Sequence, residues 1–239
     1  MKSSQAVSPL WHDVTGALRA NFLPGVVLWL LACTVVGSYF LWDQARPFFD
    51  TLGAWKSGGG FLYSIVATSI FAGLIPWVVL RLLPGTRSQA TASSLVFLVV
   101  FWAYRGLEMD AFYRLQGLMF GNDGSLGSIA AKVLFDQFVY NVFWAGGYQL
   151  LAYHWKDSGF RLSAFRGYDW KGLLSHRLPV LLVSTWLVWF PVAALMYSLP
   201  ADLQIPVFNL VACFWSLVVA TLTKPKASAA PKERAIPSE

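Results

Sequence analysis

Charged side chains are scarce in this sequence. Aspartate, glutamate, lysine and arginine make up 13% of the 239 residues, whereas apolar residue types make up 56%. A soluble globular protein carries about 25% charged residues, and a soluble fold has no place to bury so large an apolar surplus. The composition therefore argues against an ordinary soluble domain and favours a protein whose solvent is lipid.

Cysteine and the common catalytic motifs are also rare or missing. Cys33 and Cys213 both lie inside apolar runs, which excludes a secreted disulfide framework. We expect His12, His154 and His176 in separate loops, and the chain has no HExxH motif, no Gly-x-Ser-x-Gly motif and no glycine-rich phosphate loop. The sequence therefore predicts that the protein is not an enzyme and has no catalytic residues, metal ligands or cofactor.

Six apolar runs approach the length of a membrane span. A helix rises 1.5 Å per residue, so roughly 20 residues cross about 30 Å of hydrocarbon. Helices are expected because a backbone in lipid must satisfy its own hydrogen bonds. The sequence predicts an all-α fold, a polytopic transmembrane helix bundle that forms a single domain over residues 1–222. The expected membrane helices are residues 23–42, 61–83, 91–107, 127–153, 178–199 and 205–222.

The distribution of basic residues predicts the orientation. Thirteen of the 18 lysines and arginines fall in segments on the same side as the two termini, four fall on the opposite side, and Lys132 lies within a run. Cytoplasmic loops retain positive charge, so both termini are expected in the cytoplasm. The segment 223–239 is predicted to be a disordered basic cytoplasmic tail. Because the basic residues are spread in short clusters between apolar runs, we expect no nucleic-acid partner.

Two charged residues interrupt the fourth run. Lys132 and Asp136 are four residues apart, which places them on one face of an α-helix. Tyr140 continues that face, and a second polar stripe beside it begins at Gln137. For a helix that starts near residue 127, Lys132 lies about 7 Å deep and can reach the surface, whereas Asp136 lies about 13 Å deep. A charge at that depth costs several kilocalories per mole and marks a pathway, a relay or a structural pair.

The residues alone leave two interpretations open. In the first, Lys132 and Asp136 neutralise each other, or pair with Arg105 and Glu108 at the end of the third run, and only lock the bundle together. In the second, they line a water-filled path. For Asn209 in the last run, a hydrogen bond between helices is favoured over a place in a pore.

Three stretches of the chain resemble a known family. Their patterns are a glycine followed by an aromatic-tyrosine pair, a lysine, apolar triplet and Asp-Gln signature, and a closing motif similar to aromatic, Val-Pro and tryptophan. They are similar to the peroxisomal and mitochondrial integral membrane protein family named after the Mpv and PMP proteins, over roughly residues 103–220. The matching residues are Arg105-Gly106-Leu107 with Phe112-Tyr113-Arg114-Leu115, then Lys132-Val133-Leu134-Phe135-Asp136-Gln137, and finally Tyr197-Ser198-Leu199-Pro200 with Asn209 and Trp215.

The resemblance implies a non-selective or weakly selective channel for small solutes. We therefore expect a channel or channel-like protein in a lipid bilayer with a small molecule or ion as permeant. The alternative is a structural or scaffolding membrane protein without transport activity. The leader lacks the Arg-rich amphipathic character of a transit peptide, which favours a bacterial cytoplasmic membrane. In a eukaryote the expected site is a mitochondrial inner or peroxisomal membrane. The sequence leaves open the permeant, the gating and whether the chain forms a homo-oligomer.

Overall fold

A computed structural model describes residues 10–84 and 86–222 of the chain. Within these residues all the regular elements are helices, which confirms the predicted all-α class. Several helices continue into one another through short π-helical segments, in which hydrogen bonds run from residue i to i+5. The predicted tail 223–239 lies outside the described residues.

The helices follow one another with short connections. In chain order they are α1 (Leu10–Leu41), η1 (Asp43–Ala45), α2 (Arg46–Thr68), the π-helix η2 (Ser69–Leu74), α3 (Ile75–Leu82), η3 (Arg87–Gln89), α4 (Ala92–Phe120), α5 (Leu126–Phe135), the π-helix η4 (Asp136–Ala145), α6 (Gly146–Asp157), η5 (Leu162–Phe165), α7 (Trp170–Gly172), the π-helix η6 (Leu173–Arg177), α8 (Leu178–Tyr197) and α9 (Ala201–Leu222).

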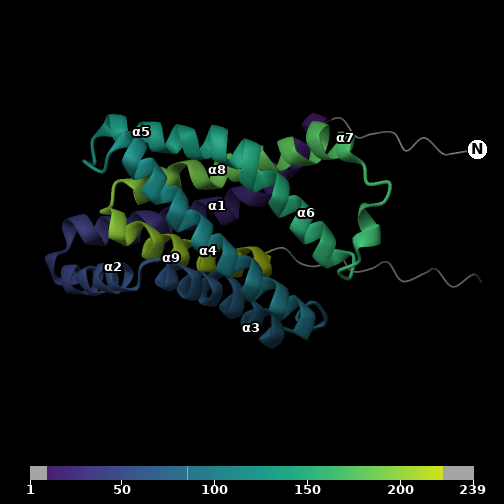
Figure 1. Ribbon diagram of the computed structural model, residues 1–239, viewed down its shortest axis with the longest axis horizontal. Coiled ribbons are helices and arrows are strands. Elements are labelled where there is room, and N and C mark those ends of the chain that lie inside the picture. Colours follow the sequence, from purple (N-terminus) through teal and green to yellow (C-terminus); the bar gives the residue numbers. More distant parts are fainter. Residues whose placement is uncertain (1–9, 85, 223–239) are drawn as a thin grey trace, which may run out of the picture.

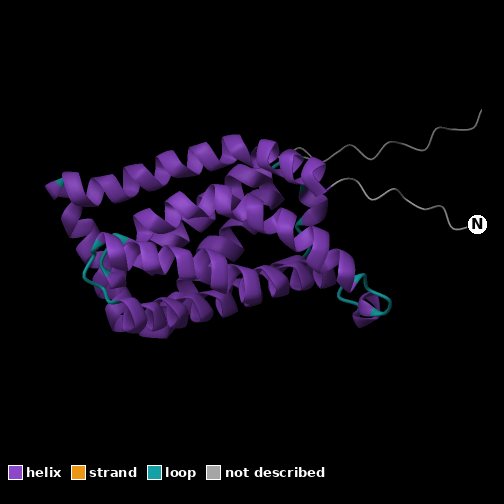
Figure 2. Cartoon of the chain, turned by 90° about the horizontal axis from the view of Figure 1, so that it is seen from above, coloured by secondary structure: helices purple, strands orange, loops and turns teal. Residues whose placement is uncertain are grey.

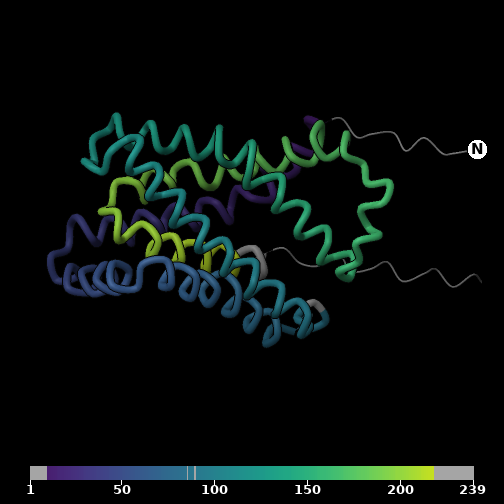
Figure 3. Tube along the Cα trace, in the orientation of Figure 1, coloured from purple at the N-terminus to yellow at the C-terminus, as the bar shows by residue number. Residues whose placement is uncertain are grey.

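The long helices run roughly along the long axis of the molecule, as Figures 1 and 2 show. Helix α1 packs against α8 and α9, and α2 packs against α4 and α9. The connections 83–91 and 158–169 lie at one end of the bundle, which we call the basic end (Figure 1). The connections 42–45, 121–125 and 198–200 lie at the other end, which we call the far end. Figure 3 shows the chain trace passing back and forth between the two ends.

The exterior of the bundle is apolar and its interior is partly polar. Three helical segments, Leu10–Leu41, Asp43–Leu82 and Trp170–Tyr197, are long and apolar enough to cross a membrane. Large apolar patches in contact with water are rare in soluble monomers, so this distribution indicates a membrane location. Exposed apolar side chains include Leu30, Leu62, Val96, Phe143 and Leu174, whereas Lys56, Arg105, Asp110, Lys132 and Asp136 are buried.

Helices α1 and α4 extend well beyond the predicted membrane spans. Helix α1 begins at Leu10 and contains Pro24, although the run was expected to start at residue 23. Helix α4 continues to Phe120, whereas the third run was expected to end at residue 107. The charged residues after 107 ended the apolar run in the sequence without ending the helix, because they find partners within the bundle. One of these partnerships is the pair of Arg114 and Asp110 at i,i+4 spacing.

Helix α2 contains a break, and the histidines lie elsewhere than expected. Helix α2 runs through the Gly58-Gly59-Gly60 stretch and breaks at Gly60, where φ is 52°. Glycine adopts a positive φ at little cost, so the chain can bend there. The histidines lie in helices rather than loops, with His12 in α1, His154 in α6 and His176 in η6.

Candidate functional site

Lys132 and Asp136 are both buried, but they do not pair. Lys132 is 2% exposed, and its Nζ donates a 2.7 Å hydrogen bond to Oδ1 of Asn122 in the far-end connection. Asp136 is 6% exposed and accepts hydrogen bonds from the Tyr197 hydroxyl at 2.9 Å and from Nδ2 of Asn141 at 3.3 Å. The hypothesis that the two charges neutralise each other is therefore wrong. The long lysine side chain carries its ammonium toward the helix start, whereas the short aspartate side chain cannot follow.

Arg105 and Glu108 form a polar cluster with three aromatic side chains. Nη1 of Arg105 lies 3.0 Å from Oε2 of Glu108 and donates to the hydroxyls of Tyr140 at 2.8 Å and Tyr148 at 2.5 Å. Nε1 of Trp144 donates to Oε1 of Glu108 at 2.5 Å, and the Tyr148 hydroxyl donates to Oε2. The expected pairing of Arg105 and Glu108 with Lys132 or Asp136 is wrong, because the two residues pair with each other.

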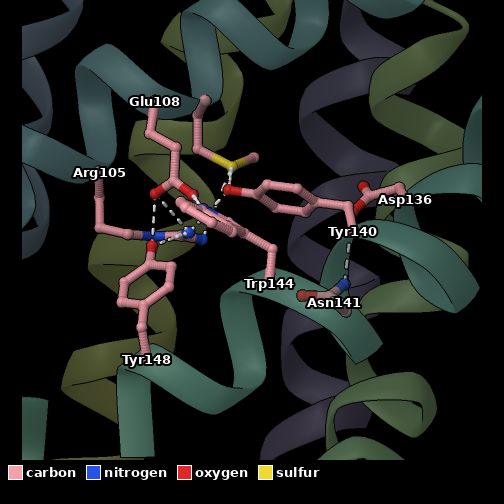
Figure 4. Close-up of polar contacts among 8 residues, drawn as sticks. Arg105, Glu108, Asp136, Tyr140, Asn141, Trp144 and Tyr148 are labelled. Atoms are coloured by element: carbon pink, nitrogen blue, oxygen red, sulfur yellow. Dashed lines mark hydrogen bonds and ion pairs between the residues drawn. The ribbon is translucent and has the colours of Figure 1, made fainter. Parts of the chain in front are cut away.

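Figure 4 shows how this cluster relates to Asp136. Tyr140 lies between the Arg105–Glu108 pair and Asp136, and its hydroxyl points toward Arg105. The Tyr140 ring stacks on Phe112 with centroids 4.0 Å apart, which fixes its orientation. The carboxylate of Asp136 and the guanidinium of Arg105 therefore have separate hydrogen-bond partners: Asp136 has Tyr197 and Asn141, and Arg105 has Glu108 and two tyrosine hydroxyls.

Gln137 and Asn209 occupy the packed interior. Gln137 is 1% exposed, and its backbone carbonyl accepts a 2.9 Å hydrogen bond from Nε1 of Trp186 on α8. Asn209 is 2% exposed, and its Oδ1 accepts a 2.7 Å hydrogen bond from the hydroxyl of Thr68. The Thr68 bond joins α2 to α9, and the Trp186 bond joins η4 to α8.

A second charged cluster was not found from the sequence. Asp110 of α4 is 3% exposed and accepts from Nζ of Lys56 at 3.0 Å, from the Ser64 hydroxyl at 2.8 Å and from Nε of Arg114 at 2.9 Å. Lys56 and Arg114 lie between the apolar runs of the sequence, so the hydropathy pattern predicts connections at both positions. The spacing of four residues between Asp110 and Arg114 was the available signal.

A cavity of about 740 Å³ enters the bundle from the basic end. Near that end it is lined by Asn21, Thr86 and Lys156, and deeper in the bundle it reaches Arg105 and Asp136. We call it the basic-end cavity. Its wall combines polar and aromatic side chains, and the polar ones deep in the bundle are Arg105, Asp136, Gln137, Tyr140 and Asn141.

A second cavity of about 470 Å³ lies at the far end. It is lined by Asn122, Asp123, Lys132 and Tyr197, among others, and we call it the far-end cavity. Asp123 accepts hydrogen bonds from the backbone N–H of Ser125 at 3.1 Å and from its hydroxyl at 3.0 Å, and these bonds hold the pKa of the Asp123 carboxyl below its usual range. This wall therefore carries one carboxylate that is ionised at neutral pH and one lysine.

Comparison of the chain with protein-family models, with curated proteins and with solved structures finds no match.

Proposed function

We propose that this chain is a multi-pass membrane protein that forms a channel or channel-like path for small solutes. The observation that carries the proposal is the basic-end cavity, which brings about 740 Å³ of space to Arg105 and Asp136 inside an apolar bundle. Protein interiors are close-packed, so a bundle that needed only stability would fill such a space. Ionisable residues that face a cavity within a membrane mark the paths of solutes and ions.

We propose six membrane spans, formed by α1, α2–η2–α3, α4, α5–η4–α6, α7–η6–α8 and α9. Three of these segments meet the length and hydropathy of a span by themselves. The helices α4 and α5–η4–α6 carry buried charges, which lower their hydropathy without exposing those charges to lipid. The basic end, with Arg161 and Arg166 in its longest connection, is then cytoplasmic.

Solute flux into proteoliposomes tests the channel. The purified chain should carry glycerol faster than protein-free vesicles do, measured by light scattering after an osmotic step. Ser184 lines the basic-end cavity, so Ser184→Phe should fill part of it and reduce flux several-fold. Val96 is 63% exposed on the outside of α4, and Val96→Phe serves as the matched control, with flux unchanged. Flux no faster than that of protein-free vesicles would refute the proposal.

A structural or scaffolding role is the second candidate. It is favoured by the Lys56–Asp110–Arg114 cluster, whose charges pair with one another and join α2 to α4. Such a protein would show no flux, and its thermal stability would depend on these pairs. Exchanging the charges of Lys132 and Asp136 would not separate the two candidates, because each residue has its own neutral partners.

We also propose that the protein is not an enzyme. Oδ2 of Asp13 lies 2.7 Å from Nε2 of His176, and Oδ1 of Asp13 lies 3.4 Å from Nδ1 of His12. The first contact joins α1 to η6, so the histidine beside this carboxylate has a structural role.

A bacterial cytoplasmic membrane remains our proposed location.

A further inference from the structure

The two cavities lie toward opposite ends of the bundle, and one hydrogen bond joins a wall residue of the first to a wall residue of the second. Asp136 lines the basic-end cavity, Tyr197 lines the far-end cavity, and the Tyr197 hydroxyl donates to Oδ2 of Asp136 at 2.9 Å. Both residues are buried, at 6% and 3% exposure. The donor and the acceptor of this bond thus belong to the walls of different cavities.

The partition between the cavities is thin. Along α5 and η4, Lys132 faces the far-end cavity and Asp136 faces the basic-end cavity, and four residues of helix rise only about 6 Å. Along α8, the adjacent residues Met196 and Tyr197 face different cavities in the same way. The Tyr113 ring packs edge-on against Tyr197, with centroids 5.4 Å apart, and also lines the basic-end cavity.

We propose that Tyr197 is the gate of the solute path and that its hydrogen bond to Asp136 holds the gate closed. This inference rests on the proposed channel function. Tyr197 is the last residue of α8 and is followed by the short connection 198–200. In this gate, a change of the Tyr197 side-chain rotamer joins the two cavities without displacement of a whole helix.

The partners of Asp136 indicate the class of permeant. Within residues 10–84 and 86–222, Asp136 receives hydrogen bonds from neutral donors, Tyr197 and Asn141, and forms no ion pair. When Tyr197 moves away, a solute with a hydroxyl or an N–H group replaces it as the donor. Asp136 disfavours anions on the basic-end side, and on the far-end wall Lys132 disfavours cations while Asp123 disfavours anions. The permeant is therefore a small uncharged hydrogen-bond donor of the type of glycerol or urea.

Removal of the phenol hydroxyl tests the gate. Tyr197→Phe should raise glycerol flux into proteoliposomes about tenfold, because a hydrogen bond to a charged acceptor no longer favours the closed state. Asp136→Asn should give a smaller increase, since the amide oxygen still accepts. Tyr63 on α2 lines neither cavity, so Tyr63→Phe is the matched control and should leave glycerol flux at the parent value. Size-exclusion chromatography confirms that each variant is folded.

A labelling experiment gives an independent readout. In a variant with Cys33 and Cys213 replaced by alanine, Ala193→Cys places a thiol in the basic-end cavity. A membrane-impermeant maleimide added from the far-end side should label it faster when Tyr197→Phe is also present.

Three outcomes would overturn parts of this account. If Tyr197→Phe changes neither the glycerol flux nor the labelling rate, the gate is wrong and the channel proposal is unaffected. No flux in any variant would overturn the channel, and the gate with it. Na⁺ or Cl⁻ flux as fast as glycerol flux would overturn the permeant class.

Discussion

Arg105 and Asp136 show two ways in which the bundle stabilises a buried charge. Arg105 has an opposite charge, Glu108, at 3.0 Å and two tyrosine hydroxyls as further acceptors. Asp136 has neutral donors instead, one from α8 and one from its own helix. A charge with hydrogen bonds but no counterion can exchange one donor for another, which suits a residue on a solute path. A charge inside a compact ion pair suits a fixed wall.

The Arg105–Glu108 pair can be tested by removal of its negative charge. Glu108→Gln leaves the guanidinium of Arg105 buried without its counterion, and breaking a buried pair in this way costs about 3 kcal/mol. We expect a clear fall in the thermal unfolding temperature of the protein in detergent. Asp157→Asn is the matched control, because the Lys156–Asp157 pair is at the surface with the aspartate 66% exposed. Its loss should cost less than about 1 kcal/mol. Equal falls for both variants would contradict this account.

Among the elements, the π-helix η4 changes which residues face each other. An α-helical pattern places Asn141 on the stripe beside Asp136, because neighbours on an α-helix are three or four residues apart. In a π-helix the neighbours are five apart, and Nδ2 of Asn141 reaches Oδ1 of Asp136 at 3.3 Å. The two polar stripes expected from the sequence therefore merge at this point. The sequence showed that the helix carried polar residues but not which of them meet.

The close approach of α2 and α4 gives a prediction for these helices. A Cβ atom on Gly106 would lie 2.2 Å from the backbone oxygen of Ser64, so Gly106→Ala forces the two backbones apart. We expect a loss of about 2 kcal/mol, the typical cost of overpacking. A Cβ atom on Gly147 of α6 would meet nothing within 4 Å. Gly147→Ala should therefore be neutral or stabilise by up to about 1 kcal/mol. Thermal unfolding in detergent measures both, and a neutral Gly106→Ala would contradict the packing argument.

The whole molecule has a polar interior inside an apolar exterior, with basic residues concentrated at one end. This arrangement suits a bundle surrounded by lipid, because the charges that lipid would penalise are turned toward other helices or toward the cavities. The two ends of the bundle differ in their number of basic residues, as expected of a protein with one orientation in the membrane.

The orientation of the bundle can be measured with single cysteines. In the background with Cys33 and Cys213 replaced, Asp43→Cys places a thiol at the far end, where the Asp43 side chain is 99% exposed. Leu162→Cys places one at the basic end, where Leu162 is 76% exposed. With the basic end in the cytoplasm, a membrane-impermeant maleimide should label position 43 in intact cells and position 162 only after permeabilisation. The reverse pattern would place the basic end outside the cytoplasm.

The sequence by itself determined the helical class and identified part of the set of buried polar residues. Both follow from local properties, since long apolar runs predict helices in lipid and rare charges within or beside them must be buried or paired. Lys132, Asp136, Gln137, Tyr140, Arg105 and Asn209 were candidate residues from the sequence and all are buried, whereas the buried Lys56 and Asp110 were not among the candidates. Only the tertiary structure decided their partners. Tyr197 and Asp136 are 61 residues apart, and Lys56 and Asp110 are 54 apart. Such contacts depend on how the helices pack and on the π-helical turns, which no periodicity of a single segment contains.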